Sequence, residues 1–178
     1  MTRHRFLLVA LFGLLLAFTR DASADATILT GTSVRVKSLG ILGSVKLYTI
    51  QHYMAEKPAT KSKQAVIDAD VDKKFIWTMQ RDLPSEKVKR ALQDAFAMNG
   101  YGDGGKIGQF LAAFTGEELK EKSQLTIVYN AKSQTTTVNV PGGKSATIPG
   151  TDFMKGVWSI WFGKIDQPSM GDQLIANL

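Results

Sequence analysis

The sequence predicts an α+β fold, in which an antiparallel β-sheet is covered on one side by a layer of helices. Two observations predict this class. The first is the period of the apolar residues, which alternate in some segments and recur at helical spacing in others. The second is the order of those segments, because strands come first, then helices, then strands again and finally helices.

Three strands are expected in the first half of the chain, at residues 26–37, 45–54 and 74–80. In the first of them, Val34 and Val36 point to one face, while Arg35 and the other polar residues point to the opposite face. Gly40 and Gly43 mark the turn to the second strand, which is rich in β-branched and aromatic residues.

The middle of the chain predicts two helices. Asp82 is a plausible cap and Pro84 suits a first turn, after which apolar residues recur at i, i+3, i+4, i+7 and i+8. These apolar residues are Val88, Ala91, Leu92, Ala95 and Phe96. The first helix is expected to end at Asn99-Gly100, and a second apolar stripe spans residues 107–114.

The last third of the chain predicts a strand pair followed by two helices. The strands are expected at residues 125–130 and 135–140. Thr151 or Asp152 can cap a third helix that stops at Gly163, and a short terminal helix covers residues 169–178. The structure of residues 65–72 is ambiguous from the sequence.

The first 24 residues are expected to be a cleaved secretory signal, which leaves a single domain at residues 25–178. After a basic start, the apolar run at 6–18 is shorter than the about 20 residues that span a bilayer. Small residues at 22–24 form the expected cleavage site, although the cut could also follow Ala26; an uncleaved anchor is the alternative. Export without any cysteine favours a periplasmic or secreted bacterial protein.

The charge of the chain argues against nucleic acid as a partner. Without the leader it carries 19 basic and 15 acidic residues, a net charge of +4, and lysines alternate with acids as on a solvated surface. No later stretch reaches the length of a transmembrane helix, so we expect no integral membrane span after cleavage.

Two motifs and one histidine that could hold a cofactor or metal have ordinary explanations. Residues 100–105 fit G-x-G-x-x-G, but a helix rather than a strand is expected before them. Residues 68–72 resemble the start of a calcium loop, yet Lys73 replaces the required glycine and Met79 the final glutamate. His52 is the only histidine after the leader, so no histidine cluster can bind a metal. We expect neither a cofactor nor a metal.

Arg35 and the tryptophans of the third helix are the residues most open to two interpretations. Arg35 shares a strand face with Ser33 and Lys37, so on pattern alone it could simply be solvated. Trp161 is expected in the core, whereas Trp158 lies on a different face of the helix and could line a ligand pocket or an interface.

The chain resembles the chalcone isomerase-like family over essentially all of residues 25–178. The resemblance rests on the order and spacing of several segments rather than on one motif. These are 31–43 with Arg35, 45–54, 82–88, 107–114 and 152–163, followed by Pro168 and Leu174. The family implies an open-faced β-sandwich, an antiparallel sheet under a layer of helices with a cleft between them.

The resemblance also implies roles for particular residues. In plant isomerases of this family an arginine steadies an attacking phenolate, and a tyrosine and a threonine act through water on the developing enolate. Arg35 matches the arginine, and Ser159 falls at or beside a late serine or threonine position. Tyr48 stands where the threonine is expected, with Thr49 next to it.

Two positions depart from the plant pattern. The tyrosine and an asparagine of the isomerases are replaced by Pro84 and Ala91, neither of which can donate a side-chain hydrogen bond. The leading hypothesis is therefore an exported, non-catalytic binder of a small hydrophobic acid such as a fatty acid. Arg35 would anchor the carboxylate, as the related plant fatty-acid-binding proteins imply.

Five residues are the candidates for ligand binding: Arg35, Tyr48, Thr49, Trp158 and Ser159. Two alternatives remain open at this point. One is an isomerase or intramolecular lyase, in which Arg35 stabilises an oxyanion and Tyr48 donates a proton. The other is an envelope protein-interaction module that uses Trp158 and the loop at residues 100–105. The sequence does not specify an oligomeric state.

Overall fold

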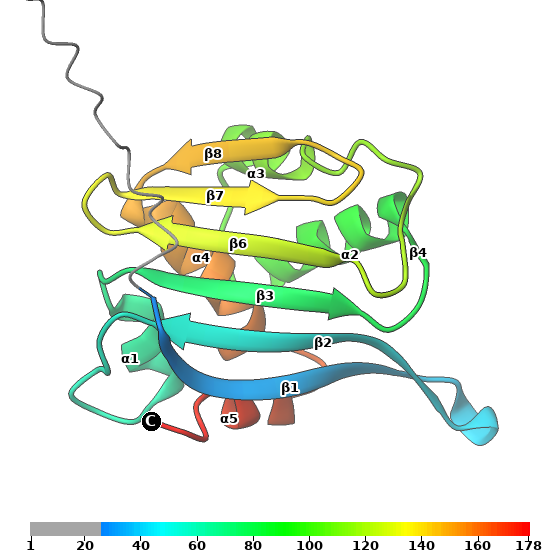
Figure 1. Cartoon of the computed structure of the whole chain (residues 1–178), viewed down its shortest axis with the longest axis horizontal. Helices are drawn as coiled ribbons and strands as arrows, with labels where there is room; N and C mark the ends of the chain where they lie inside the picture. Colours follow the sequence, from blue (N-terminus) through cyan, green and yellow to red (C-terminus); the bar gives the residue numbers. More distant parts are fainter. Residues whose placement is uncertain (1–25) are drawn as a thin grey trace, which may run out of the picture.

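The structure, a computed structural model, describes residues 26–178 and has the predicted α+β class. Six strands form one antiparallel sheet in the order β1-β2-β3-β6-β7-β8 (Figure 1). They are β1 (Ile28–Ser38), β2 (Ser44–Met54), β3 (Lys73–Met79), β6 (Gln124–Asn130), β7 (Thr135–Asn139) and β8 (Ser145–Pro149). Two short strands, β4 (Leu83–Pro84) and β5 (Glu118–Leu119), pair separately.

The helices lie together behind one face of this sheet (Figure 1). They are η2 (Gly40–Leu42), α1 (Lys63–Asp68), α2 (Ser85–Met98), α3 (Gly104–Leu111), α4 (Thr151–Phe162) and α5 (Ser169–Leu174), and only the 3₁₀ turn η2 lies apart, at the tip of the β1–β2 hairpin. Strand alternation explains why the helices cover one face of the sheet: in β3 every second residue, from Lys73 to Met79, is buried against the helices. The helix layer and the sheet thus enclose the core.

The sequence prediction missed elements whose apolar signal is weak. In β8 a single residue, Ile148, is buried, so the strand has almost no alternation to detect. α1 is only six residues long and is capped by the Ser62 side chain, which accepts a hydrogen bond from the Ala65 amide. Asp82 caps no helix; its carboxylate accepts a hydrogen bond from the Glu121 amide, because β4 intervenes before α2.

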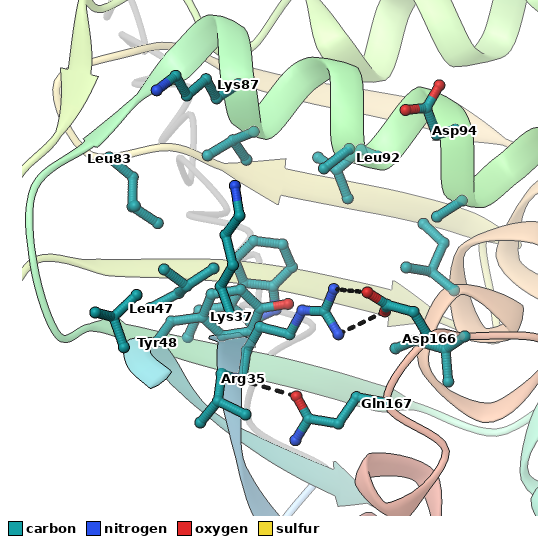
Figure 2. Close-up of a pocket in the computed structure, with 18 of the residues that line it drawn as sticks. Arg35, Lys37, Leu47, Tyr48, Leu83, Lys87, Leu92, Asp94, Asp166 and Gln167 are labelled. Carbon is teal, nitrogen blue, oxygen red and sulfur yellow. Dashed lines mark hydrogen bonds and ion pairs between the residues drawn. The ribbon is translucent and has the colours of Figure 1, made fainter. Parts of the chain in front are cut away.

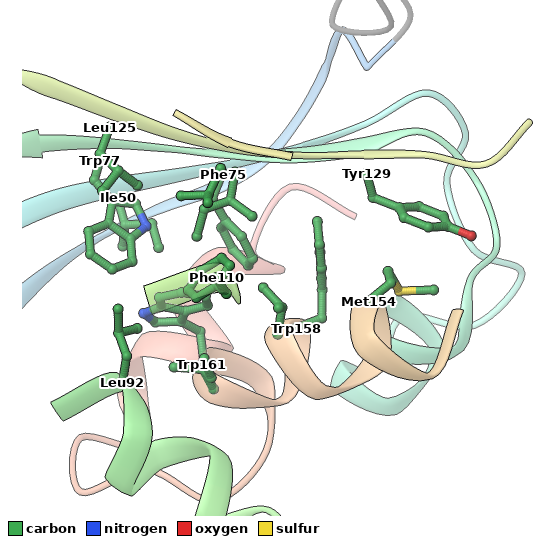
Figure 3. Packing of buried hydrophobic residues seen from close by; sticks show 14 of the residues in the cluster. Ile50, Phe75, Trp77, Leu92, Phe110, Leu125, Tyr129, Met154, Trp158 and Trp161 are labelled. Carbon is green, nitrogen blue, oxygen red and sulfur yellow. The ribbon is translucent and has the colours of Figure 1, made fainter. Parts of the chain in front are cut away.

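Aromatic side chains fill the core between sheet and helices (Figure 3). Phe75 of β3 lies 5.0 Å from Trp158 and 4.6 Å from Trp161 between ring centroids, and Trp77 meets Trp161 edge-on at 5.1 Å. Offset and edge-to-face contacts of this kind are the favourable geometries for aromatic pairs. α4 therefore presses against the middle of the sheet.

A buried histidine links that core to the edge of the sheet. The Trp158 indole donates to Nε2 of His52 at 2.8 Å, and the Nδ1 of His52 lies 2.6 Å from the Thr30 hydroxyl. Because indole is only a donor, Nε2 must be unprotonated and Nδ1 carries the proton. The Thr30 hydroxyl in turn donates to the Leu174 carbonyl at 2.8 Å, which ties β1 to α5. His52 has an architectural role here.

Lys73 is a second buried side chain of the core that can carry a positive charge. Its Nζ donates to the carbonyl oxygens of Val66, Ile67 and Ala69 at the end of α1, at 2.7, 3.2 and 2.8 Å. It also lies 4.9 Å from the centroid of the Trp158 ring. Burial lowers the pKa of Lys73 to about 7. A lysine thus serves as the C-terminal cap of a helix.

The stability of the fold should depend on pH through His52. Burial, with a smaller contribution from the charge of Lys73, holds the pKa of His52 well below its ordinary value. The unfolded chain takes up a proton near pH 6.5 that the folded chain does not, so stability should fall as pH drops below that value. We expect a slope approaching about 1.4 kcal/mol per pH unit from this residue. Urea unfolding between about pH 7 and pH 5 should show it, and His52→Gln should lack this component.

The expected leader and its cleavage after Ala24 lie outside the described residues. Within residues 26–178, no helix combines the length and the hydropathy that crossing a bilayer requires.

Candidate functional site

A cleft opens between the β1–β2 end of the sheet, α2 and the loop that follows α4 (Figure 2). Its volume is about 1000 Å³, which is at the upper end of the range for small-molecule sites. Arg35, Leu47 and Tyr48 form part of its floor, and Trp77 and Trp161 close its inner end. The cleft is open to solvent on its outer side, since several of its lining residues on α2 are exposed.

A β-bulge shapes the floor. Arg35 pairs with Tyr48, but the next residue, Val36, pairs with Lys46, so Leu47 has no partner on β1. The extra residue bends the hairpin and lets the consecutive residues Leu47 and Tyr48 both line the cleft. The bulge thus places the apolar side chain of Leu47 beside Arg35 and Tyr48 on the cleft floor.

Arg35 is paired with Asp166, which lies in the loop after α4. Nη2 donates to Oδ2 at 2.9 Å, and Nη1 lies 2.7 Å from Oδ1 as an ion pair without a well-directed hydrogen bond (Figure 2). The Arg35 side chain is 21% exposed, whereas Asp166 is 68% exposed. The hydrogen bond and charge of Arg35 lower the pKa of Asp166. Burial is the largest single influence on the pKa of Arg35 and lowers it, but the hydrogen bond to Asp166 and the charges of Tyr48 and Asp166 together outweigh burial, so the pKa of Arg35 is raised.

Gln167 fastens this loop to the free edge of β1. Its side-chain amide donates to the Val34 carbonyl at 2.9 Å, and its carbonyl oxygen accepts from the Val36 amide at 3.0 Å. One side chain thus satisfies backbone groups that an additional strand would otherwise pair. The two bonds flank Arg35, so they also fix Asp166 next to the guanidinium.

Tyr48 is the second polar group on the floor. Its ring stacks on Trp77, with centroids 4.6 Å apart and planes 5° from parallel, and its hydroxyl accepts from the Trp161 indole at 3.3 Å. Burial raises the pKa of Tyr48, so the phenol stays protonated at neutral pH. Its proton is free to be donated to a group that enters the cleft beside Arg35.

The cleft combines a cationic rim with an apolar wall. Five basic side chains line it, against three carboxylates: Arg35, Lys37, Arg81, Lys87 and Lys164, against Asp82, Asp94 and Asp166. The α2 side of the cleft is formed largely by Leu83, Pro84, Val88, Ala91, Leu92 and Ala95. An amphiphile with an anionic head and an apolar tail matches both features.

Of the five predicted site residues, the structure places Arg35 and Tyr48 on the cleft. Thr49 follows Tyr48 along the strand and therefore points to the opposite face, where it accepts a hydrogen bond from Gln80. Ser159 donates to the carbonyl of Lys155 one turn earlier in α4. Neither of these two residues lines the cleft.

Trp158 also lies away from the cleft. It is fully buried in the core, where its indole is bonded to His52. A side chain without exposed surface cannot contact a partner, so Trp158 offers nothing to the protein-interaction hypothesis in this structure.

Sequence reasoning missed the roles of Asp166 and Gln167. Both lie about 130 positions from the β1 residues that they contact, and neither belongs to a recognisable motif. The one signal in the sequence that could have suggested Asp166 was its charge, because a carboxylate in the loop after α4 can pair with a candidate cation such as Arg35. Among the described residues, no group of three or more His, Cys, Asp or Glu side chains could hold a metal ion.

Comparison with known proteins agrees with this architecture. The chain is similar to a solved structure of a fatty-acid-binding protein of Arabidopsis thaliana, with a TM-score of 0.65 and 14% identity over 84% of this chain and 86% of that chain. At that identity the similarity shows a shared fold. Comparison with curated protein sequences gives no match. The model of the chalcone isomerase-like family matches residues 13–172, and the chain therefore belongs to the chalcone isomerase-like family.

Proposed function

We propose that this protein is a non-catalytic binder of a small hydrophobic acid, such as a fatty acid, in the cleft between β1–β2 and α2. The observation that carries the proposal is Arg35, whose side chain is largely buried on the floor of a cleft with an apolar wall. A guanidinium can hold a carboxylate with two parallel hydrogen bonds and stays charged at any relevant pH. Tyr48 supplies a further donor beside it.

Three observations support the proposal. The lining is cationic on balance, and the α2 wall is apolar along several turns. Pro84 and Ala91, the positions that depart from the plant isomerases, both line the cleft, so that wall has the character of a surface for an acyl chain. The protein of similar fold from Arabidopsis thaliana is itself a fatty-acid-binding protein.

Export is part of the proposal and rests on the sequence, with its basic start, apolar run and small-residue cleavage site. The mass of the protein recovered from expressing cells tests it. A chain that begins at Asp25, or at Thr27 for the later site, is expected; an intact leader would contradict it.

Selectivity for the carboxylate tests the binding function. Trp77 and Trp161 line the cleft, so their fluorescence should report a ligand that enters it. The delipidated protein is titrated with dodecanoate and with dodecanol, which have the same chain and different heads. We expect dodecanoate to bind at least about tenfold more tightly, since a hydrogen bond to a charged group contributes about 1.5–3 kcal/mol. Equal binding, or none, would overturn the assignment.

Asp166 should compete with the ligand for Arg35. In this structure its carboxylate occupies the position on the guanidinium that a ligand carboxylate would take. Asp166→Asn removes that competing charge, so dodecanoate affinity should rise by about fivefold, which corresponds to an exposed ion pair of about 1 kcal/mol. The same fluorescence titration measures it. If the affinity falls instead, Asp166 positions Arg35 rather than competing with the ligand.

An isomerase or intramolecular lyase is a second candidate, favoured by one observation. Tyr48 is held protonated opposite Arg35, and these two groups could serve as proton donor and oxyanion stabiliser. Loss of chalcone absorbance above the spontaneous rate, abolished in Tyr48→Phe, would support this function over simple binding.

A further inference from the structure

The hairpin between β1 and β2 carries an exposed apolar tip. Ile41 and Leu42 are 103% and 80% exposed, and Leu39 is 44% exposed. Among the described residues only one other large apolar side chain, Met98, is exposed. Exposed apolar side chains that cluster at one point of a surface mark an interaction site. We call Leu39, Ile41 and Leu42 the hairpin tip.

The tip projects beyond the body of the molecule. β2 pairs with β3 only from Tyr48 to Met54, so the outer part of the β1–β2 hairpin extends past the sheet (Figure 1). The tip is nevertheless well defined: η2 forms its turn, and the Leu39 amide donates to the Gly43 carbonyl at 2.8 Å. Positive φ angles at Gly40 and Gly43 allow this tight turn. The backbone of the tip is therefore a hydrogen-bonded turn that carries exposed apolar side chains.

Two positively charged side chains lie just behind the tip. Lys37 and Lys46 are exposed on the two strands just behind it. The sequence contains no acidic residue from Ala26 to Ala55, so within the hairpin itself nothing offsets these charges. Apolar side chains at a point, with cations a few residues behind, match the layers of an anionic bilayer surface, where phosphates lie above the acyl region.

The same features argue against a protein partner. A stable protein interface buries about 800 Å² on each side, and three side chains on a narrow hairpin are far too few. A second copy would also bring two cationic hairpins together. A bilayer has neither constraint, because a few inserted side chains suffice for weak, reversible binding.

We propose that the hairpin tip docks the protein on anionic lipid surfaces, with Ile41 and Leu42 inserted among the headgroups and Lys37 and Lys46 against the phosphates. Lys37, Leu39 and Val45 also line the cleft, so docking would bring the mouth of the cleft to the lipid surface. The docking itself requires no ligand in the cleft.

Co-sedimentation with vesicles tests the proposal. The purified protein, in one processed form for all variants, is mixed with vesicles of phosphatidylcholine alone or with added phosphatidylglycerol. Binding should require phosphatidylglycerol and weaken with salt. Ile41→Ser/Leu42→Ser should reduce partitioning at least about tenfold. Lys46→Gln, which does not line the cleft, should reduce it about fivefold, whereas Lys132→Gln, a matched control at an exposed lysine outside the cleft, should match wild type.

A label gives an independent measurement of insertion. The chain has no cysteine, so Ile41→Cys and Lys132→Cys each accept an environment-sensitive dye at one position. On anionic vesicles the dye at position 41 should report an apolar environment, and the dye at position 132, which is exposed and outside the cleft, should not. The proposal is overturned if wild-type protein binds neither vesicle type, or if a tip variant sediments with anionic vesicles like wild type. So does self-association that depends on the tip without vesicle binding. Because the readout is vesicle binding, loss of dodecanoate affinity would leave it standing.

Discussion

Arg35→Gln is expected to weaken dodecanoate binding by about 30-fold or more. Removing one member of a hydrogen-bonded charge pair in a partly buried site costs about 2 kcal/mol or more. Glutamine keeps a polar side chain of moderate length but loses the charge and the paired donors. The fold should tolerate the change, because the abandoned carboxylate of Asp166 is 68% exposed and stays hydrated. Tryptophan fluorescence titration measures the affinity.

Two variants make the Arg35 result specific. Lys37→Gln removes an exposed cation that lines the same cleft, and we expect a loss below about fivefold, as for a solvated charge. Arg35→Lys retains the charge without the planar fork and should give an intermediate affinity. Equal losses in Arg35→Gln and Lys37→Gln would mean that general attraction, and not an anchor, binds the ligand.

Gly31→Ala is expected to destabilise the fold by about 3 kcal/mol or more, the upper range for overpacked sites. A Cβ at this position would lie 2.5 Å from the carbonyl carbon of Leu174 and closer still to the Gln173 carbonyl oxygen. Both obstacles are backbone atoms at the end of α5, so neither can rotate away. α5 would have to move off β1 and break the Ser33–Gln173 bond. Urea unfolding measures the loss.

Gly108→Ala is the matched control for that substitution. Gly108 lies in α3, and a Cβ there meets nothing within 4 Å. Alanine is favoured over glycine in a helix by about 1 kcal/mol, so this variant should be neutral or slightly more stable. If both variants unfolded at the wild-type urea concentration, the close packing of α5 on β1 would be wrong.

The sheet, the helix layer and the central helices could be predicted because their apolar residues keep a regular period. Leu92 and Phe96 are buried on α2 as their spacing indicated, and Trp161 is in the core. The alternation that places Ser33 and Arg35 on one strand face was also detectable. The sequence did not reveal that this face is covered by α5 and the loop after α4. Solvated and covered polar faces have the same pattern in a sequence.

The site could be predicted only in part, because long-range contacts have no local signal. The family resemblance led to Arg35 and Tyr48, which are cross-strand partners on the cleft floor. It gave no indication that Asp166 would pair with the arginine, because the two residues lie 131 positions apart and share no motif. Trp158 was predicted for a pocket or an interface, but it is buried in the core. The polar partner that makes its burial favourable is His52, which lies 106 positions away.

The charge state of a bound carboxylate tests the central claim most directly. Dodecanoate labelled with ¹³C at the carboxyl carbon is bound to the protein, and its chemical shift is followed as the pH is lowered. A carboxylate held by the Arg35 guanidinium should have a pKa below that of the free acid, because an adjacent opposite charge favours the ionised form. A pKa above that of the free acid would place the carboxyl group in the apolar part of the cleft, away from Arg35, and would contradict the account.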